Sequence, residues 1–197
     1  MRPARTRRRS RPSTRRRGIP RTRSTRSARA SRPIPDREPA LREAVRAVVL
    51  DRDNRVLLFK AFQDNTRARH FWITPGGGVA VGESATDALR RELAEECGLV
   101  AADIGPLIWV REHVFPMPHS GEATRQRERF YLVRVEQHDV DVSGWDDFER
   151  NFMGEHRWWT ASEVQTSDDE FAPHRLGHFL ADLVAGNIPS EPVDTGI

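Results

Sequence analysis

The chain has 197 residues, with 32 basic and 29 acidic side chains and one cysteine, Cys97. This length suits a single well-buried domain, and a lone cysteine excludes an intramolecular disulfide and a four-cysteine metal site, which favours a reducing, cytoplasmic location. Because no run of about 18 apolar residues occurs, the sequence predicts no membrane-spanning helix.

The first 37 residues differ in composition from the rest of the chain. They carry 15 arginines and one acid, Asp36, a formal charge of +14, which leaves 17 basic and 28 acidic residues and a charge of −11 for residues 38–197. With almost no apolar side chain to bury, residues 1–37 are expected to form a disordered tail. Two other interpretations stay open: sequence translated upstream of the true start, and weak attraction of the tail to nucleic acid. The acidic remainder disfavours nucleic acid as a partner elsewhere.

Two strands and a helix are predicted in the first half of the domain, which is expected over residues 38–190. Residues 44–50 and 55–62 are rich in β-branched and apolar side chains and flank turn residues, which indicates a hairpin. A helix is predicted over residues 84–97, with Ser84 as N-cap and Gly98 as the C-terminal stop. Its apolar stripe, expected to pack on the sheet, consists of Leu89, Leu93 and Cys97.

The second half of the domain is also predicted to contain both strands and helices. Strands are expected at residues 107–115, 129–135 and 156–160, followed by a helical turn at 161–165 and an amphipathic helix at 173–185. Residues 191–197 are expected to form a loose C-terminal tail. Strands interleaved with helices predict a single α/β or α+β domain.

Three carboxylates fall on one face of the predicted helix. Glu92, Glu95 and Glu96 are spaced i, i+3 and i+4, so their like charges repel one another. A hard divalent cation relieves that repulsion, and Mg²⁺ prefers such oxygen ligands. The sequence therefore predicts a metal site on this face, where the small side chains of Ala85 and Ala88 would leave room for metal and ligand.

Residues 77–99 read GGVAVGESATDALRRELAEECGL. Gly77, Glu83, the Arg91-Glu92-Leu93 triplet, the Glu95-Glu96 pair and the Gly98-Leu99 pair have the spacing of the Nudix box, so the chain resembles the Nudix hydrolase superfamily. The resemblance implies an α/β/α sandwich with a mixed central sheet. It also implies an enzyme, dependent on Mg²⁺ or Mn²⁺, that hydrolyses a pyrophosphate bond in a nucleoside diphosphate linked to another group: a nucleoside triphosphate, a nucleotide sugar or ADP-ribose.

The same resemblance implies roles for single residues. Either Glu92 or Glu95 would take the proton from the attacking water. Arg91 is expected to belong to the catalytic residues as well, by orienting Glu83 or a neighbouring carboxylate. The implied metal ligands are the backbone carbonyl of Gly76 and the side chains of Glu92, Glu95 and Glu96.

Three assignments outside the box stay open. Nudix proteins often have an extra carboxylate in a later loop, and either Glu149 or Glu155 could supply it. Arg125 could bind a substrate phosphate, although an exposed, alternating strand edge is the favoured explanation of this residue. Three tryptophans could stack on a nucleobase or belong to the core: Trp72, Trp158 and Trp159.

The function expected from these features is hydrolysis of a small nucleotide. An RNA-end pyrophosphohydrolase is the first alternative, and the acidic domain disfavours it. A non-catalytic nucleotide-sensing module is the second, and the complete set of box carboxylates disfavours it. Substrate choice is expected to depend on the loops at residues 63–70, 116–124 and 137–154, and a homodimer is compatible with the sequence.

Overall fold

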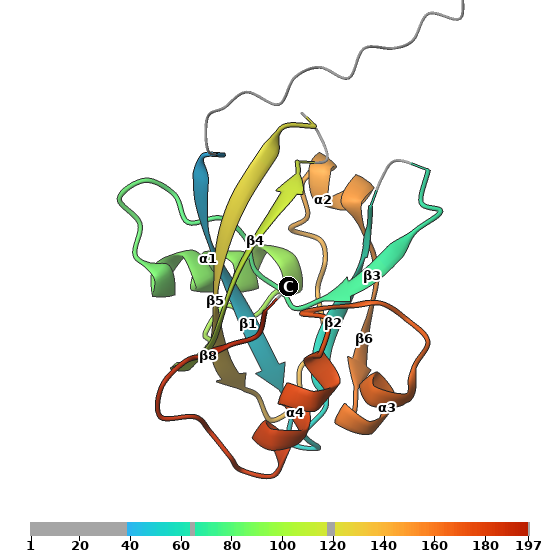
Figure 1. Cartoon of the computed structure of the whole chain (residues 1–197). Coiled ribbons are helices and arrows are strands. Elements are labelled where there is room, and N and C mark those ends of the chain that lie inside the picture. The colour runs from blue at the N-terminus through green and yellow to red at the C-terminus, as the bar shows by residue number, and fades with distance from the viewer. Residues whose placement is uncertain (1–38, 64–65, 118–120, 197) are drawn as a thin grey trace, which may run out of the picture. The chain divides into compact units, whose positions relative to one another are not determined.

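The computed structural model describes residues 39–63, 66–117 and 121–196. The chain divides into two units, Met1–Asp36 and Arg37–Ile197, so the expected disordered tail lies outside the described residues. The elements of the second unit (Figure 1) are β1 (Leu41–Leu50), β2 (Val56–Phe62), β3 (His70–Ile73), α1 (Ala85–Cys97), β4 (Ile104–Pro116), β5 (Ala123–Arg134), α2 (Asp147–Phe152), β6 (Met153–Trp159), α3 (Ala161–Thr166), β7 (Phe171–Ala172), α4 (Leu176–Val184) and β8 (Val193–Asp194).

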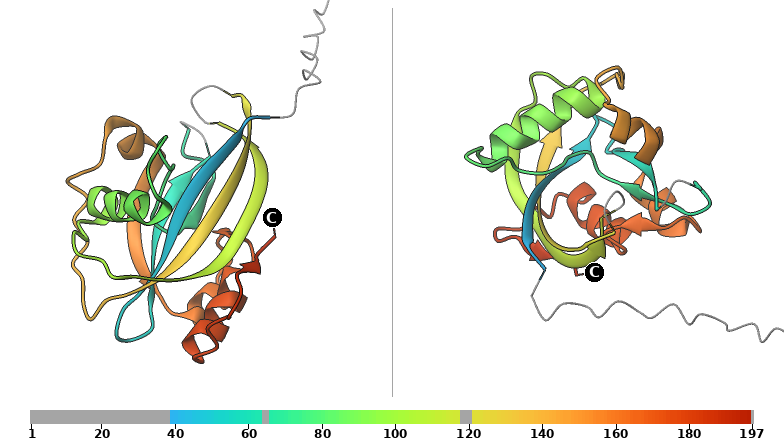
Figure 2. Two further views of the ribbon diagram at one scale, coloured as in Figure 1. Left: turned by 90° about the vertical axis from the view of Figure 1, so that its left-hand side faces the viewer. Right: turned by 90° about the horizontal axis from the view of Figure 1, so that it is seen from above.

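One mixed sheet runs through the described part of the domain. Its strand order is β7-β3-β2-β1-β5-β4-β8, and β6 also pairs with β2. Strand β1 is parallel to β5 along its whole length, whereas β2 with β3 and β4 with β5 are antiparallel. Helix α1 covers one face of this curled sheet, and α3 and α4 lie on the other (Figure 2). The expected α/β/α sandwich with a mixed sheet is therefore confirmed.

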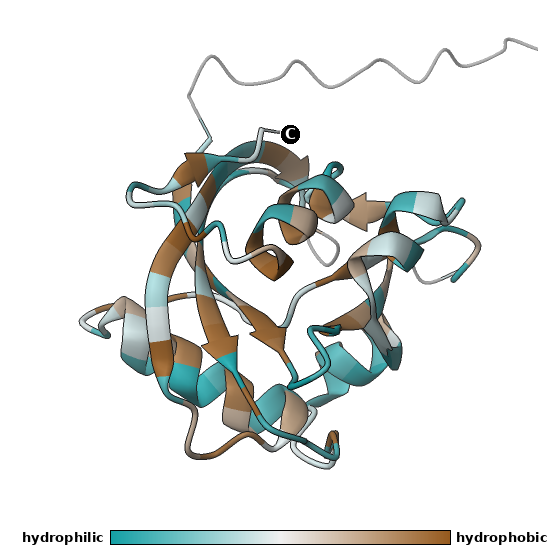
Figure 3. Ribbon diagram, turned by 90° about the horizontal axis from the view of Figure 1, so that it is seen from below, coloured by the Kyte–Doolittle hydropathy of each residue, from teal (hydrophilic) through white to brown (hydrophobic). Residues whose placement is uncertain are grey.

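The sheet buries apolar side chains on both faces, because successive strand residues point in opposite directions. Val45, Ala47 and Val49 of β1 belong to the core cluster under α1, together with the predicted stripe of that helix. Val48 and Leu50 belong to the second cluster, with residues of α4. In Figure 3, hydrophobic residues follow the strands through the middle of the domain and the side of α4 that faces them.

Several strands begin earlier than predicted, among them β1 at Leu41 and β6 at Met153. β4 begins at Ile104 rather than at residue 107, and β5 begins at Ala123 rather than at residue 129. The added part of β5 is polar, but its charges are compensated across the ladder, since Arg125 and Arg127 both pair with Glu112 on β4. Ion pairs between β4 and β5 therefore accompany strand pairing in a polar segment, where the lack of apolar residues had predicted a loop.

Three predictions about the later part of the chain need correction. The region 137–154 contains a short helix, α2, where a loop was expected, and α4 begins at Leu176 rather than at residue 173. The C-terminal residues are not a loose tail throughout: Val193–Asp194 pairs with β4, and the buried Thr195 donates its backbone N–H to the carbonyl of Val110 at 2.9 Å. Among the residues with described structure, no helix is long and apolar enough to cross a membrane.

Candidate active site

Helix α1 begins and ends at the residues that the sequence predicts. The hydroxyl oxygen of Ser84 accepts a hydrogen bond from the backbone N–H of Asp87 at 3.1 Å. Gly98 adopts a left-handed conformation at the C-cap, with φ of 69°, and its N–H donates to helix carbonyls. Both ends satisfy backbone groups that a helix leaves unpaired, so the carboxylates of α1 are held at fixed positions.

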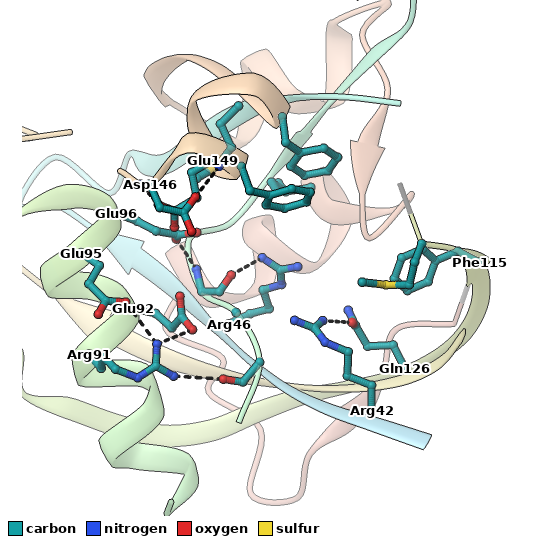
Figure 4. Close-up of a pocket in the computed structure, with 18 residues that line it drawn as sticks. Arg42, Arg46, Arg91, Glu92, Glu95, Glu96, Phe115, Gln126, Asp146 and Glu149 are labelled. Atoms are coloured by element: carbon teal, nitrogen blue, oxygen red, sulfur yellow. Dashed lines mark hydrogen bonds and ion pairs between the residues drawn. The ribbon is translucent and has the colours of Figure 1, made fainter. Parts of the chain in front are cut away.

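Two of the three α1 carboxylates point into the protein. Glu92 and Glu96 are buried, with 8% and 5% of their surface exposed, whereas the side chain of Glu95 is 49% exposed. A third carboxylate comes from α2: single oxygens of Glu92, Glu96 and Glu149 all lie within 4.8 Å of one another. Figure 4 shows these three side chains converging from the two helices.

Glu149 reaches this position because the segment before α2 is anchored to α1. The indole N–H of Trp145 donates to the backbone carbonyl of Glu96 at 2.8 Å, and its ring packs on Phe59 at 5.8 Å between centroids. The alternative candidate, Glu155, is exposed and pairs with Lys60. The structure thus brings Glu149, and not Glu155, to the α1 carboxylates.

Burial changes the acidity of this cluster. It raises the pKa of Glu96 to about 8, although Arg46 and the N–H of Gly76 favour the charged form. Burial also raises the pKa of Glu149, and the charges of Asp146 and Glu92 act in the same direction. Buried carboxylates that repel one another are stabilised by a divalent cation, so this donor set fits a hard metal ion.

The glycine loop before α1 approaches the site where a side chain would collide. Gly76 has φ of 130°, and a Cβ there would lie 2.2 Å from the carbonyl oxygen of Val45. A Cβ at Gly77 would lie 2.5 Å from the carboxylate of Glu92. The N–H of Gly76 donates to Glu96 at 2.6 Å, so the loop backbone and the carboxylates form one unit.

Arg91 makes the contacts that were expected of it. Its Nε donates to Glu83 at 3.0 Å, and one terminal nitrogen donates to Glu92 at 2.8 Å and to Glu95 at 3.1 Å. The other terminal nitrogen donates to the carbonyl of Gly78 at 3.1 Å. These hydrogen bonds raise the pKa of Arg91 above its usual value, chiefly through Glu83. Arg91 therefore ties the glycine loop to the carboxylate face.

Ala85 and Ala88 do not line the pocket beside the carboxylates, contrary to expectation. Ala88 is fully buried in the core cluster under α1, and Ala85 packs against that cluster. Glu92, Glu95 and Glu96 line the pocket, whereas the two alanines, earlier in the helix, lie against the apolar side chains of the core. Helical spacing correctly predicted that the carboxylates share one face of α1, but it wrongly predicted that the two alanines lie beside the metal.

A pocket of about 350 Å³ opens beside the carboxylates. Phe115 of β4, Met117 just after that strand, and Phe148 and Phe152 of α2 give it an apolar wall, and the two α2 rings are stacked with 5.6 Å between centroids. None of the three tryptophans considered for base stacking is among its lining residues: Trp72 and Trp159 are core residues, and Trp158 packs against the core.

Arg42 lines the pocket, as do Arg46 and Arg91, whereas Arg125 is not among the lining residues. Side chains alternate along β5, so Gln126 faces the pocket while Arg125 points the other way and pairs with Glu112. Arg42 on β1 donates to the amide oxygen of Gln126 (Figure 4). Burial, followed by the charge of Arg46, lowers the pKa of Arg42 from its usual value. Even so, a guanidinium stays cationic at neutral pH.

Comparison with known proteins then identifies the family, because the NUDIX domain profile matches residues 40–183. The chain belongs to the NUDIX domain family. Its curated relatives include the RNA pyrophosphohydrolase of Francisella tularensis subsp. tularensis (strain WY96-3418), 28% identical over 149 residues that cover 70% of this chain and 92% of the relative. The RNA pyrophosphohydrolase of Francisella philomiragia subsp. philomiragia is 30% identical over 109 residues, 52% of this chain and 67% of the relative.

Solved Nudix structures share the fold at lower sequence identity. The MutT protein from Methanosarcina mazei Go1 matches with a TM-score of 0.56 and 19% identity, covering 77% of this chain and 99% of that one. The dihydroneopterin triphosphate pyrophosphohydrolase of E. coli matches with a TM-score of 0.53 and 17% identity, covering 73% and 95%. The expected class, a Nudix hydrolase that acts on acid anhydrides, is confirmed, and such enzymes generally use divalent metals.

A buried ion-pair network outside the Nudix box was not predicted. Glu128 of β5 is fully buried and accepts hydrogen bonds from Arg46 at 3.0 Å, Arg111 at 2.6 Å and Gln126 at 2.9 Å. Burial alone would raise the pKa of Glu128, but Arg46 and Arg111 hold it at about 2. The network reaches the active site because Arg46 also donates to the carbonyl of Gly76 at 2.6 Å. Its members are far apart in sequence, so only strand pairing reveals it.

Proposed function

We propose that this Nudix hydrolase cleaves the pyrophosphate bond of a small nucleotide, with Mg²⁺ or Mn²⁺ held by Glu92, Glu96 and Glu149. The convergence of these carboxylates from α1 and α2 is the observation that carries the proposal. A divalent ion there supplies charge neutralisation for the phosphate oxygens and lowers the pKa of bound water. Carboxylate oxygens are the donors that Mg²⁺ prefers, so the residues present suit this role.

The proton of the attacking water requires a base, and the geometry favours Glu95 over Glu92. Glu95 lines the pocket but lies outside the carboxylate cluster, and half of its side chain is exposed. Glu92 belongs to the cluster and would already be occupied by the metal. Arg91 acts as a positioning residue here, because it donates to both of these carboxylates.

Arg42 is proposed to bind a substrate phosphate in place of Arg125. It lines the same pocket as the metal-binding carboxylates, and its partner Gln126 is neutral, so its charge remains available to an anion. Arg125, by contrast, is paired with Glu112. Arg42 and Glu95 line the same pocket, so a phosphate bound by Arg42 would share that pocket with the proposed base.

The apolar wall of the pocket is proposed to bind the nucleobase. Phe115 on β4 and the stacked pair Phe148 and Phe152 on α2 offer flat surfaces on which a base can stack. The volume of about 350 Å³ is at the small end of the range for ligand pockets, roughly 300–1,000 Å³, which suits a mononucleotide.

An RNA-end pyrophosphohydrolase is the second candidate, favoured by the activity for which the Francisella relatives are named. The arginines on the outer face of β5 do not add support. Arg125 and Arg127 pair with Glu112, and Arg129 pairs with Glu43, so this strand offers little unpaired positive charge to a polyanion. We therefore rank the small nucleotide first, and a cytoplasmic location and a homodimer remain predictions.

A substrate panel tests the proposal. Full-length protein is incubated with Mg²⁺, or with EDTA, and nucleoside triphosphates, nucleotide sugars, ADP-ribose or 5′-triphosphorylated RNA, and the products are separated by ion-exchange chromatography. We expect metal-dependent cleavage of a small nucleotide at the pyrophosphate bond. Faster turnover of RNA than of every small nucleotide would favour the second candidate, and no cleavage of any substrate would favour a nucleotide-sensing module.

A further inference from the structure

Arg46 lies where the buried ion-pair network meets the active site. It is a β1 residue whose side chain is 15% exposed, and its Nε donates to Glu128 at 3.0 Å. One terminal nitrogen donates to the carbonyl of Gly76 at 2.6 Å and to that of Thr74 at 3.3 Å. Figure 4 shows the Arg46 guanidinium directed at the glycine loop from the side opposite α1.

The carbonyl that Arg46 contacts is the one that resemblance to the Nudix box assigns to the metal. Its backbone is already fixed without Arg46. The neighbouring carbonyls of Pro75 and Gly77 accept hydrogen bonds from the N–H groups of Ala47 and Val45, each at 2.9 Å, and the N–H of Gly76 is bonded to Glu96. What Arg46 adds is therefore a hydrogen bond and a positive charge at the carbonyl oxygen.

That charge acts on the proposed metal site. Arg46 is drawn electrostatically toward Glu128, Glu96 and Glu92, which together outweigh the effect of burial and raise its pKa, so it remains a cation. A cation close to Glu96 and Glu92 lowers the attraction of these carboxylates for a divalent ion. Its hydrogen bond to the Gly76 oxygen also uses part of the acceptor capacity of that carbonyl.

From this geometry we propose that Arg46 competes with the divalent metal for the carbonyl of Gly76. The free protein then binds metal through the carboxylates of Glu92, Glu96 and Glu149, and more weakly than a site with an open carbonyl would. This inference rests on the proposed metal site. The buried partner Glu128 keeps the guanidinium in place, because it holds Arg46 from the side away from the loop.

Metal binding without substrate tests the inference. Mn²⁺ affinity and stoichiometry are measured by isothermal titration calorimetry and by the EPR signal of free Mn²⁺, on the full chain. The main variant is Arg46→Met/Glu128→Gln, which removes the cation together with its buried counter-charge. The matched control is Glu128→Gln alone, which disturbs the network but keeps the guanidinium.

We expect the double variant to bind Mn²⁺ at least tenfold more tightly than the natural protein, and Glu128→Gln to bind it no more tightly. Unchanged or weaker binding by a folded double variant would overturn the inference while leaving the proposed function intact. If neither the natural protein nor the double variant bound Mn²⁺, both would fail. Should the double variant not fold, Arg46→Gln and Arg46→Lys give the same comparison: the first is expected to tighten Mn²⁺ binding and the second is not.

Discussion

Glu149 is the residue of α2 that meets the carboxylates of α1, although the two helices are far apart in the sequence. Its carboxylate meets those of Glu92 and Glu96, yet it lies on a different helix, more than 50 residues later in the sequence. A carboxylate in that position can complete the ligand set of a metal that one helix face alone would hold loosely. This makes Glu149 the residue whose removal best separates a metal site from an accidental cluster of acids.

We expect Glu149→Gln to lower kcat/KM by about a hundredfold or more, because a proposed metal ligand loses its charge, and loss of a residue that only supports a metal ligand already costs about 10- to 100-fold. Glu155→Gln is the matched control: it changes the same residue type on the adjoining strand, where the side chain is exposed and paired with Lys60. Activity is measured over a range of Mg²⁺ concentrations. Equal loss of activity in both variants would count against the proposed ligand set.

Arg42→Met should raise KM by about tenfold or more with a smaller change in kcat, because a hydrogen bond between charged groups contributes roughly 1.5–3 kcal/mol. Arg125→Met, on the other side of the neighbouring strand, should leave KM within about twofold, since its partner is Glu112 and not substrate. Steady-state kinetics on the substrate found in the panel decide between them. A larger KM effect from Arg125 would instead favour Arg125 as the phosphate-binding residue.

At the scale of elements, the position of α2 depends on one indole. Trp145 lies just before the helix, and its hydrogen bond to the Glu96 carbonyl fixes the segment that presents Glu149. We expect Trp145→Phe to lower the free energy of unfolding by about 1 kcal/mol through loss of that bond. We also expect it to lower kcat, because α2 is no longer held against α1.

Trp158→Phe provides the control for this prediction. Trp158 packs against the same core cluster, but it lies on β6. Its replacement should change stability through packing and leave kcat nearly unchanged. Urea unfolding and steady-state kinetics on both variants measure the two quantities. If kcat fell equally in both, the loss would reflect general loosening of the core and not the position of α2.

The elements also show why some of the site was predictable and some was not. Helix α1 was, because Ser84 and Gly98 mark its ends and its carboxylates recur at helical spacing. Glu149 was not chosen over Glu155, because that choice depends on how Trp145 anchors a segment of weak local preference. Arg125 was considered for phosphate binding and Arg42 was not, because the sequence does not show which face of a strand lines the pocket; on β5 it is the face of Gln126, one residue after Arg125.

At the scale of the whole molecule, the buried network around Glu128 should control stability in acid. Arg46 and Arg111 lower the pKa of Glu128 from 4.5 to about 2, so folding favours its charged form. The stabilisation is complete above about pH 4.5 and is lost as the pH falls toward 2. A shift of this size corresponds to roughly 3 kcal/mol.

We expect Glu128→Gln to lower the free energy of unfolding at pH 7 by about 3–5 kcal/mol, since two buried guanidinium groups lose their counter-charge. The difference from the natural protein should shrink between pH 4.5 and 2. Glu112→Gln, which changes a partly exposed carboxylate on β4, should cost about 1 kcal/mol or less. Denaturant unfolding at several pH values measures both, and a pH-independent difference for Glu128→Gln would argue against the ionised, paired carboxylate.

The capping box of α2 has a consequence for the order in which ligands bind. The carboxylate of Glu149 accepts a hydrogen bond from the backbone N–H of Asp146 at 2.7 Å, so the side chain that faces the metal site also closes the first turn of its own helix. If Glu149 moved to bind a metal, its hydrogen bond in the first turn of α2 would change, and the position of α2 with Phe148 and Phe152 would change with it. If the proposed metal and nucleobase both bind there, thermodynamic reciprocity would link the two events: a metal that ordered α2 would favour binding of the base, and a bound base would raise the affinity for the metal by the same factor.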